Sequence, residues 1–127
     1  MAKGEVSPET KEKKRRINKE IKRLSDVLRE VPEETFQAAD GLINRAAFMR
    51  VTLEDYEADL TENGHTEMFS QSEKTEPYER ERPVARLYNS MVKNYTTTLV
   101  KLFDLIPNKA NNDPVDPAYE KFFGKGK

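Results

Sequence analysis

The chain has 127 residues, of which 35% are hydrophobic and 35% charged, and its mean hydropathy is −0.89. It contains no cysteine and one histidine, His65, which excludes disulfides, thiolate metal sites, thiol nucleophiles and any site that needs two histidines. A chain of this length forms one domain at most, and its low apolar content favours a core that is partly shared between identical copies.

The charges are segregated along the sequence, although the net charge is only −1. Residues 1–30 hold 10 Lys/Arg and 6 Asp/Glu (net +4), residues 31–81 hold 4 and 13 (net −9), and residues 82–127 hold 8 and 4 (net +4). The N-terminal block is therefore a basic arm, and such asymmetry points to a charged partner. There is no apolar run of about 18 residues and no signal segment, so we expect a cytosolic protein that does not enter membranes.

Residues 8–30 are predicted to form an amphipathic helix, with Ser7 as N-cap, Pro8 at the first position and Val31-Pro32 closing it. Its apolar stripe runs from Ile17 to Val31, and the opposite side is cationic. A row of cations suits phosphate neutralisation, but a solvated surface or, less favourably, a membrane-surface helix would show the same pattern. The candidate phosphate-binding residues are Lys11, Lys14, Arg15, Arg16, Lys19, Lys22 and Arg23.

Residues 33–62 are predicted to form a second helix, ended by Asn63-Gly64. Gly41 inside it marks close packing or a local break. Phe48 and Val51 project from the side opposite the main apolar stripe, which favours a contact between subunits.

Residues 65–82 are polar and predict a loop or a short two-stranded hairpin. A third helix is expected from Pro83 to just before Pro107. Its apolar arc spans roughly 160°, whereas one buried face needs about 100°. The helix therefore either lies between the other two of its own chain or packs across a subunit boundary. The candidate oligomer-interface residues are Phe48, Val51, Leu87, Met91, Tyr95, Leu99 and Leu102.

The C-terminal segment is rich in turn residues and contains three aromatic residues on one side of a predicted helical turn, Tyr119, Phe122 and Phe123. These residues could dock into a groove of a partner or fold back onto the core of their own chain.

No catalytic constellation is present. The chain has no glycine-rich phosphate loop and no nucleophile elbow, and the acidic pairs Glu54/Asp55 and Glu57/Asp59 are predicted to be solvated. We therefore expect no enzyme activity, no metal and no cofactor.

The stretches "GLINRAAFMRVTLEDYEADLTENG" (residues 41–64) and "RERPVARLYNSMVKNYTTTLVKLFDLIP" (residues 80–107) resemble the small terminase subunit of tailed bacteriophages in its short form. The resemblance covers about residues 15–107. It implies an all-α, non-catalytic DNA-packaging protein of the bacterial host cytoplasm. Such a protein assembles into a homo-oligomeric ring, binds double-stranded phage DNA at the packaging site and recruits the large terminase subunit.

Members of this family commonly place DNA binding first, self-association next and large-subunit docking last. This order assigns residues 1–32 to DNA binding, 33–107 to oligomerisation and 108–127 to docking. A helix-turn-helix, common in the family, is not predicted, because residues 1–32 read as one helix; we expect phosphate contacts instead of groove reading. The alternatives are a protein-binding adaptor or antitoxin-like module without DNA and, third, a metal-dependent nuclease.

Overall fold

The computed structural model describes residues 6–107 and is mostly helical, with one small antiparallel sheet. The predicted order of helices and hairpin is confirmed, with one additional short helix. The elements are α1 (Pro8–Val27), α2 (Glu33–Ala38), α3 (Asp40–Asn63), β1 (Thr66–Phe69), β2 (Tyr78–Glu81) and α4 (Pro83–Phe103).

Helix α1 begins as predicted. The Ser7 side chain accepts a hydrogen bond from the Thr10 backbone N–H (3.1 Å), and Pro8 occupies the first turn, where its missing N–H leaves no helical bond unmade. The helix ends at Val27, three residues earlier than expected, because Leu28 already leaves the helical region at φ −98° and ψ 17°.

The helix predicted over residues 33–62 contains a local break, the second of the two alternatives that Gly41 left open. The helix is interrupted at Ala39, where φ is −89° and ψ is 0°, so that α2 and α3 form two segments. The Ala39 side chain is buried in the core, and the break falls directly before Asp40 and Gly41, where glycine lowers helix propensity. Helix α3 ends as predicted at Gly64, whose φ of 84° suits glycine.

Residues 65–82 form the hairpin alternative, with β1 antiparallel to β2 and Phe69 opposite Tyr78. The two rings meet edge to face at 6.0 Å, and the Arg80 guanidinium lies 3.6 Å from the centre of the Phe69 ring. Arg82 fastens the hairpin to α3 by donating to the Gly64 carbonyl (2.7 Å) and to Asp59 (3.0 Å). The side-chain amide of Asn63 and the Arg82 guanidinium hold the pKa of Asp59 below its usual value.

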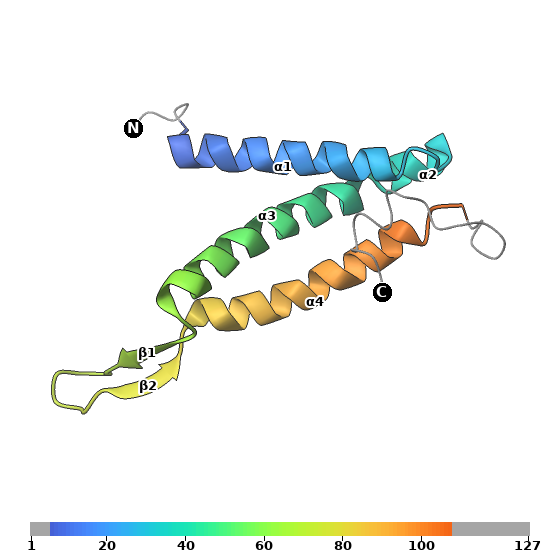
Figure 1. Cartoon of the computed structure of the whole chain (residues 1–127). Helices are drawn as coiled ribbons and strands as arrows, with labels where there is room; N and C mark the ends of the chain where they lie inside the picture. The colour runs from blue at the N-terminus through green and yellow to red at the C-terminus, as the bar shows by residue number, and fades with distance from the viewer. Residues whose placement is uncertain (1–5, 108–127) are drawn as a thin grey trace.

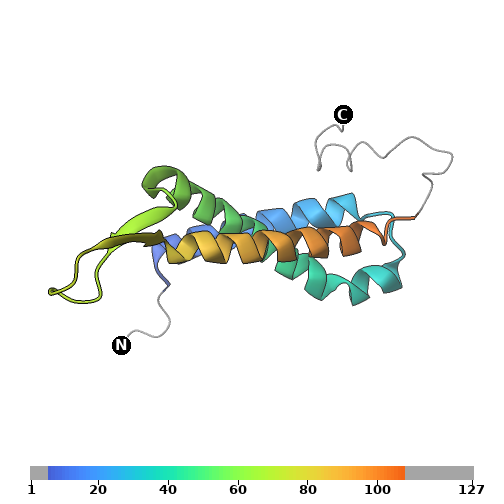
Figure 2. The same cartoon turned by 90° about the horizontal axis from the view of Figure 1, so that it is seen from below.

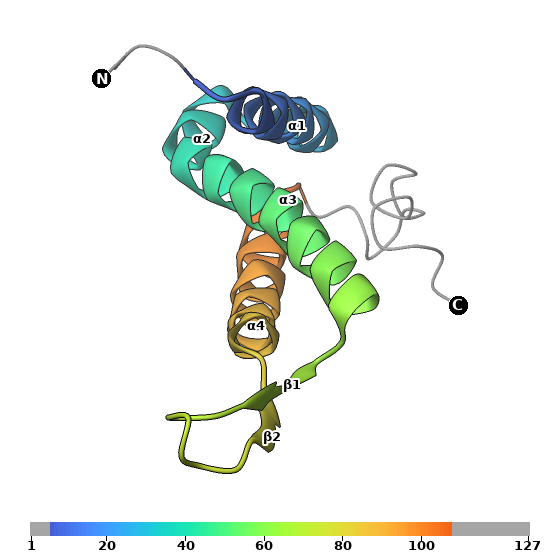
Figure 3. The same ribbon diagram turned by 90° about the vertical axis from the view of Figure 1, so that its left-hand side faces the viewer.

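Helix α3 lies between α1 and α4, which pack on its opposite sides (Figures 1 and 3). The molecule is elongated, with α2 at one end and the hairpin projecting from the other (Figure 2). The core lies toward the α2 end, where all three long helices contribute. Its fully or almost fully buried side chains include Leu24, Leu28, Ile43, Ala46, Ala47 and Leu102.

The helix with two neighbours is thus α3, so the expectation that the third helix lies between the other two of its own chain is wrong, and packing across a subunit boundary stays a prediction. Helix α4 packs mainly on α3, and Leu99, Leu102 and Phe103 are buried in the core that the three long helices share, while much of the remaining arc is half-buried. Leu87 and Val100 stay exposed, at 53% and 49%. They are 13 positions apart, which places them about 140° apart around the helix, on opposite edges of the buried face.

Candidate nucleic-acid interface

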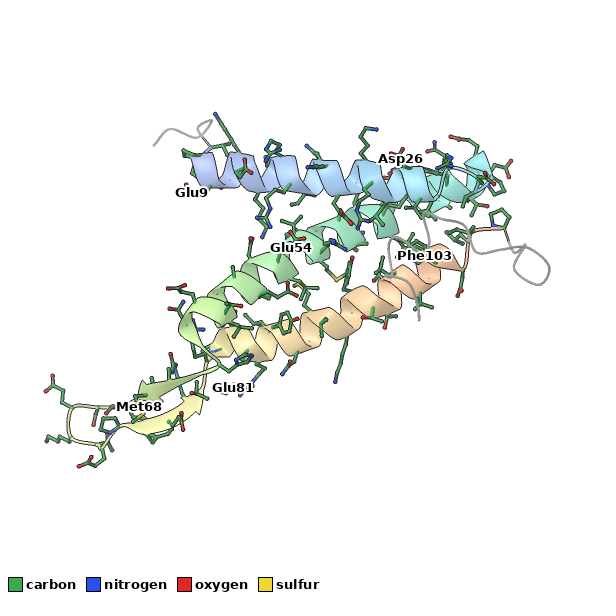
Figure 4. All side chains as sticks on the ribbon, in the orientation of Figure 1. Glu9, Asp26, Glu54, Met68, Glu81 and Phe103 are labelled. Atoms are coloured by element: carbon green, nitrogen blue, oxygen red, sulfur yellow. The ribbon has the colours of Figure 1, made fainter. Side chains whose placement is uncertain are left out.

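A surface groove runs between α1 and α3, and charged side chains dominate its walls. Six lysines and arginines face three carboxylates, so the groove is cationic overall. Glu54 lies on the part of α3 that faces α1 (Figure 4). The lining residues are Arg15, Arg16, Lys19, Glu20, Lys22, Arg23 and Asp26 from α1, and Arg50, Val51 and Glu54 from α3.

Ion pairs join the two helices at the hairpin end of this groove. Arg16 donates to Asp55 (2.8 Å) and to Glu54 (3.0 Å), and the Lys13 ammonium lies 3.5 Å from Asp55. These hydrogen bonds from Arg16 hold the pKa of its guanidinium above the usual value. Glu54 and Asp55 are therefore part of the contact between α1 and α3, whereas the sequence predicted a purely solvated pair.

Glu20 is a largely buried carboxylate among the residues that line the groove. Its side chain is only 10% exposed, and its carboxylate accepts two hydrogen bonds from Arg23 at 2.9 and 2.8 Å. Arg50 approaches from α3, 3.8 Å from Glu20 and 3.5 Å from Glu54, and donates to the Tyr95 hydroxyl of α4 (3.4 Å). Burial by itself lowers the pKa of Arg50, but the Tyr95 hydroxyl and the two carboxylates raise it, so the group stays charged.

The groove brings together five of the seven candidate phosphate-binding residues: Arg15, Arg16, Lys19, Lys22 and Arg23. Lys11 and Lys14 are exposed on α1 but do not line it. Arg15 pairs with Glu12 at 2.6 Å, and Lys22 with Asp26 at 3.7 Å.

Sequence reasoning missed Arg50. It belongs to the block of net charge −9, and nothing in the sequence places it opposite α1. The row of cations in the sequence of α1 was enough to predict the α1 side of the groove, but it gave no information about the α3 side.

The candidate oligomer interface divides into two groups. Val51, Leu99 and Leu102 are 2%, 6% and 0% exposed, so these three side chains pack within their own chain, and their contact with another subunit stays a prediction. Leu99 and Leu102 belong to the chain's own core, and Val51 lies beneath α1, where its carbonyl accepts a hydrogen bond from Arg16 (3.4 Å).

The remaining interface candidates reach the surface. Phe48 is 46% exposed, and the Lys13 ammonium lies 5.1 Å from its ring centre, which gives it a contact within the chain. Leu87, Met91 and Tyr95 follow one another at a spacing of four residues, and Leu87 is the most exposed of the three. They form a narrow apolar strip along one edge of α4.

Other kinds of site receive no support from residues 6–107. Within that range, no group of three or more His, Asp or Glu side chains is placed to hold a metal ion. No helix of that range has both the length and the apolar character needed to cross a membrane. Tyr119, Phe122 and Phe123, the predicted docking residues, lie outside the described residues.

Comparison with protein-family models, curated proteins and solved structures finds no match.

Proposed function

We propose that the chain is a non-catalytic small terminase subunit that binds double-stranded phage DNA through the groove between α1 and α3. The observation that most supports DNA binding is the excess of six cations over three carboxylates in one groove formed by two helices. Lysine and arginine in such a row neutralise backbone phosphates and release condensed counterions. The packaging role itself comes from the resemblance of residues 41–64 and 80–107.

In this proposal the subunits form an oligomeric helical bundle, closed into a ring in the host cytoplasm, and the C-terminal segment recruits the large terminase subunit. The strip of Leu87, Met91 and Tyr95 supports self-association, because it places an exposed leucine beside two half-buried apolar side chains on one helix. When such a strip binds a different surface of the next subunit, the head-to-tail contacts generate a ring if the rotation between subunits closes.

A protein-binding adaptor is the second candidate. It is favoured by the carboxylates of the chain itself, which already pair with Arg15, Arg16 and Arg23 and so reduce the charge available to a polyanion. Measurements of DNA binding separate the two functions.

The experiment compares two variants by fluorescence anisotropy on a short labelled duplex at several salt concentrations. Lys19→Gln with Lys22→Gln removes two cations of the groove, and Lys93→Gln with Lys101→Gln removes two exposed cations of α4. We expect the groove variant to bind more weakly and its logarithmic salt dependence to flatten by about 0.9 for each lost phosphate contact. Equal affinities for the two variants would reject the groove, and no binding by the unaltered protein at low salt would reject the DNA-binding function.

A further inference from the structure

Arg16 is the groove cation most completely engaged by the other helix. It contacts two carboxylates and one carbonyl of α3, and its side chain is 30% exposed. Lys19, one turn further along α1, is exposed and makes no ion pair within residues 6–107. A phosphate therefore meets Arg16 already paired with α3 but meets Lys19 without an ion pair among the described residues, although the two cations look equivalent in the sequence.

The ion pairs of Arg16 and Lys13 lie outside the apolar core. The fully buried side chains of α1 and its C-terminal turn are Leu24 and Leu28, which lie two or more turns further along the chain. Exchange of a carboxylate for another anion at Arg16 therefore leaves the core contacts of α1 in place. A phosphate offers a guanidinium the same two-oxygen geometry as a carboxylate.

We propose that Glu54 and Asp55 compete with DNA phosphate for Arg16, so that these two carboxylates limit the affinity of the groove and its salt dependence. The inference rests on the proposed function and adds to it an internal regulator of the same site. Without ligand, Arg16 and Lys13 are held on α3. When DNA binds, a phosphate pairs with Arg16 only after both carboxylates are displaced. The loss of these two ion pairs offsets much of the binding free energy that the new contact contributes.

The test neutralises the competitor without changing its shape. Asp55→Asn, and the double variant with Glu54→Gln, keep the side-chain volumes and remove only charge. We expect the double variant to bind duplex DNA about 3- to 10-fold more tightly than the unaltered protein, because exposed ion pairs of this kind contribute up to about 1 kcal/mol. The salt dependence should steepen by about 0.9 for each cation released.

Removing negative charge anywhere strengthens DNA binding to some degree, so a matched control is needed. Glu62→Gln with Glu76→Gln makes the same charge change at two exposed residues that form no ion pair within the described chain. If this control tightens binding as much as the double variant, the competition is refuted while the proposed DNA binding stands.

A second comparison tests the role of Arg16 directly. Arg16→Gln in the unaltered background should weaken binding little, because the carboxylates already hold that side chain. Combined with the two neutralising changes, Arg16→Gln should remove most of the gain that they produce. A gain that persists in full without Arg16 would overturn the inference. Circular dichroism of each variant checks that the helical content is unchanged.

Discussion

Two buried polar side chains on facing helices, Glu20 and Thr52, illustrate how partners determine what burial costs. Glu20 is 8% exposed, and its carboxylate has Arg23 and Arg50 around it. Thr52 is 5% exposed, and its hydroxyl has no hydrogen-bond partner among the described residues. Burial of a polar group without a partner destabilises the fold by the whole desolvation free energy. For a paired carboxylate, the ion pairs and hydrogen bonds with its cations offset that cost.

We therefore expect conservative substitutions at these two positions to have opposite effects on the free energy of unfolding. Thr52→Val should leave it unchanged or raise it by up to about 1 kcal/mol, because an unpaired hydroxyl becomes a methyl group. Glu20→Gln should lower it by about 1–3 kcal/mol, because two arginines lose their carboxylate. Urea denaturation measures both, with Glu62→Gln as an exposed control that should stay within about 0.5 kcal/mol. A destabilised Thr52→Val variant would mean that the hydroxyl has a partner after all.

At the scale of the elements, α4 differs from α3 in the number of its neighbours. Within residues 6–107, α3 is covered on two sides, but α4 packs mainly on α3, and its outer surface is mostly polar. The exposed apolar residues of α4 are therefore at the edges of its buried face, and only the edge with Leu87 continues into further apolar side chains, Met91 and Tyr95. A single exposed apolar residue needs no explanation, but a continuous strip is typical of an interface.

If this strip joins subunits, Leu87→Lys should shift the oligomer to smaller species while leaving the helices intact. Val100→Lys, at a similarly exposed position on the opposite edge of α4, is the matched control and should leave the assembly unchanged. Light scattering over a range of protein concentrations measures both. A monomeric unaltered protein at micromolar concentration would contradict self-association, and equal effects of the two variants would contradict the strip.

For the whole molecule, residues 6–107 supply a core to which all three long helices contribute. We therefore expect removal of residues 113–127 to leave folding, self-association and DNA binding unchanged. If Tyr119, Phe122 and Phe123 dock the large terminase subunit, the truncated protein should fail to retain that subunit in a pull-down from which the intact protein recovers it. Loss of the oligomer after truncation would instead assign the aromatic residues to the core.

The sequence predicted the features that depend on local chemistry. Ser7-Pro8 and Gly64 mark helix ends through their own local conformations, and the polar segment between two apolar patterns predicted a loop or a short hairpin, of which the hairpin forms. Gly41 indicated that this helix could break locally, but nothing in the sequence placed the break at Ala39. Alanine is the best helix former, and Ala39 still donates to the Thr35 carbonyl and accepts from the Ile43 N–H, both at 3.0 Å.

The candidate site was predicted only in part, for a tertiary reason. The cations of α1 form a row that the sequence shows, but the side of α3 on which α1 packs cannot be read from either helix alone. That placement buries Val51, brings Arg50 into the groove and turns Arg16 toward Glu54 and Asp55. Each of these three outcomes depends on a contact more than 25 residues distant in the chain.

The central position of α3 has a consequence for how this protein can diverge. Its two sides are covered by different helices. Substitutions that alter the ligand preference of α1 therefore require no compensating change on the outer edge of α4, and substitutions on that edge of α4 require none on α1. The middle helix has little of that freedom, because a change there disturbs both neighbours. Relatives should therefore vary in their outer helices and preserve the small, tightly fitted side chains of the middle one, such as Ala46 and Ala47.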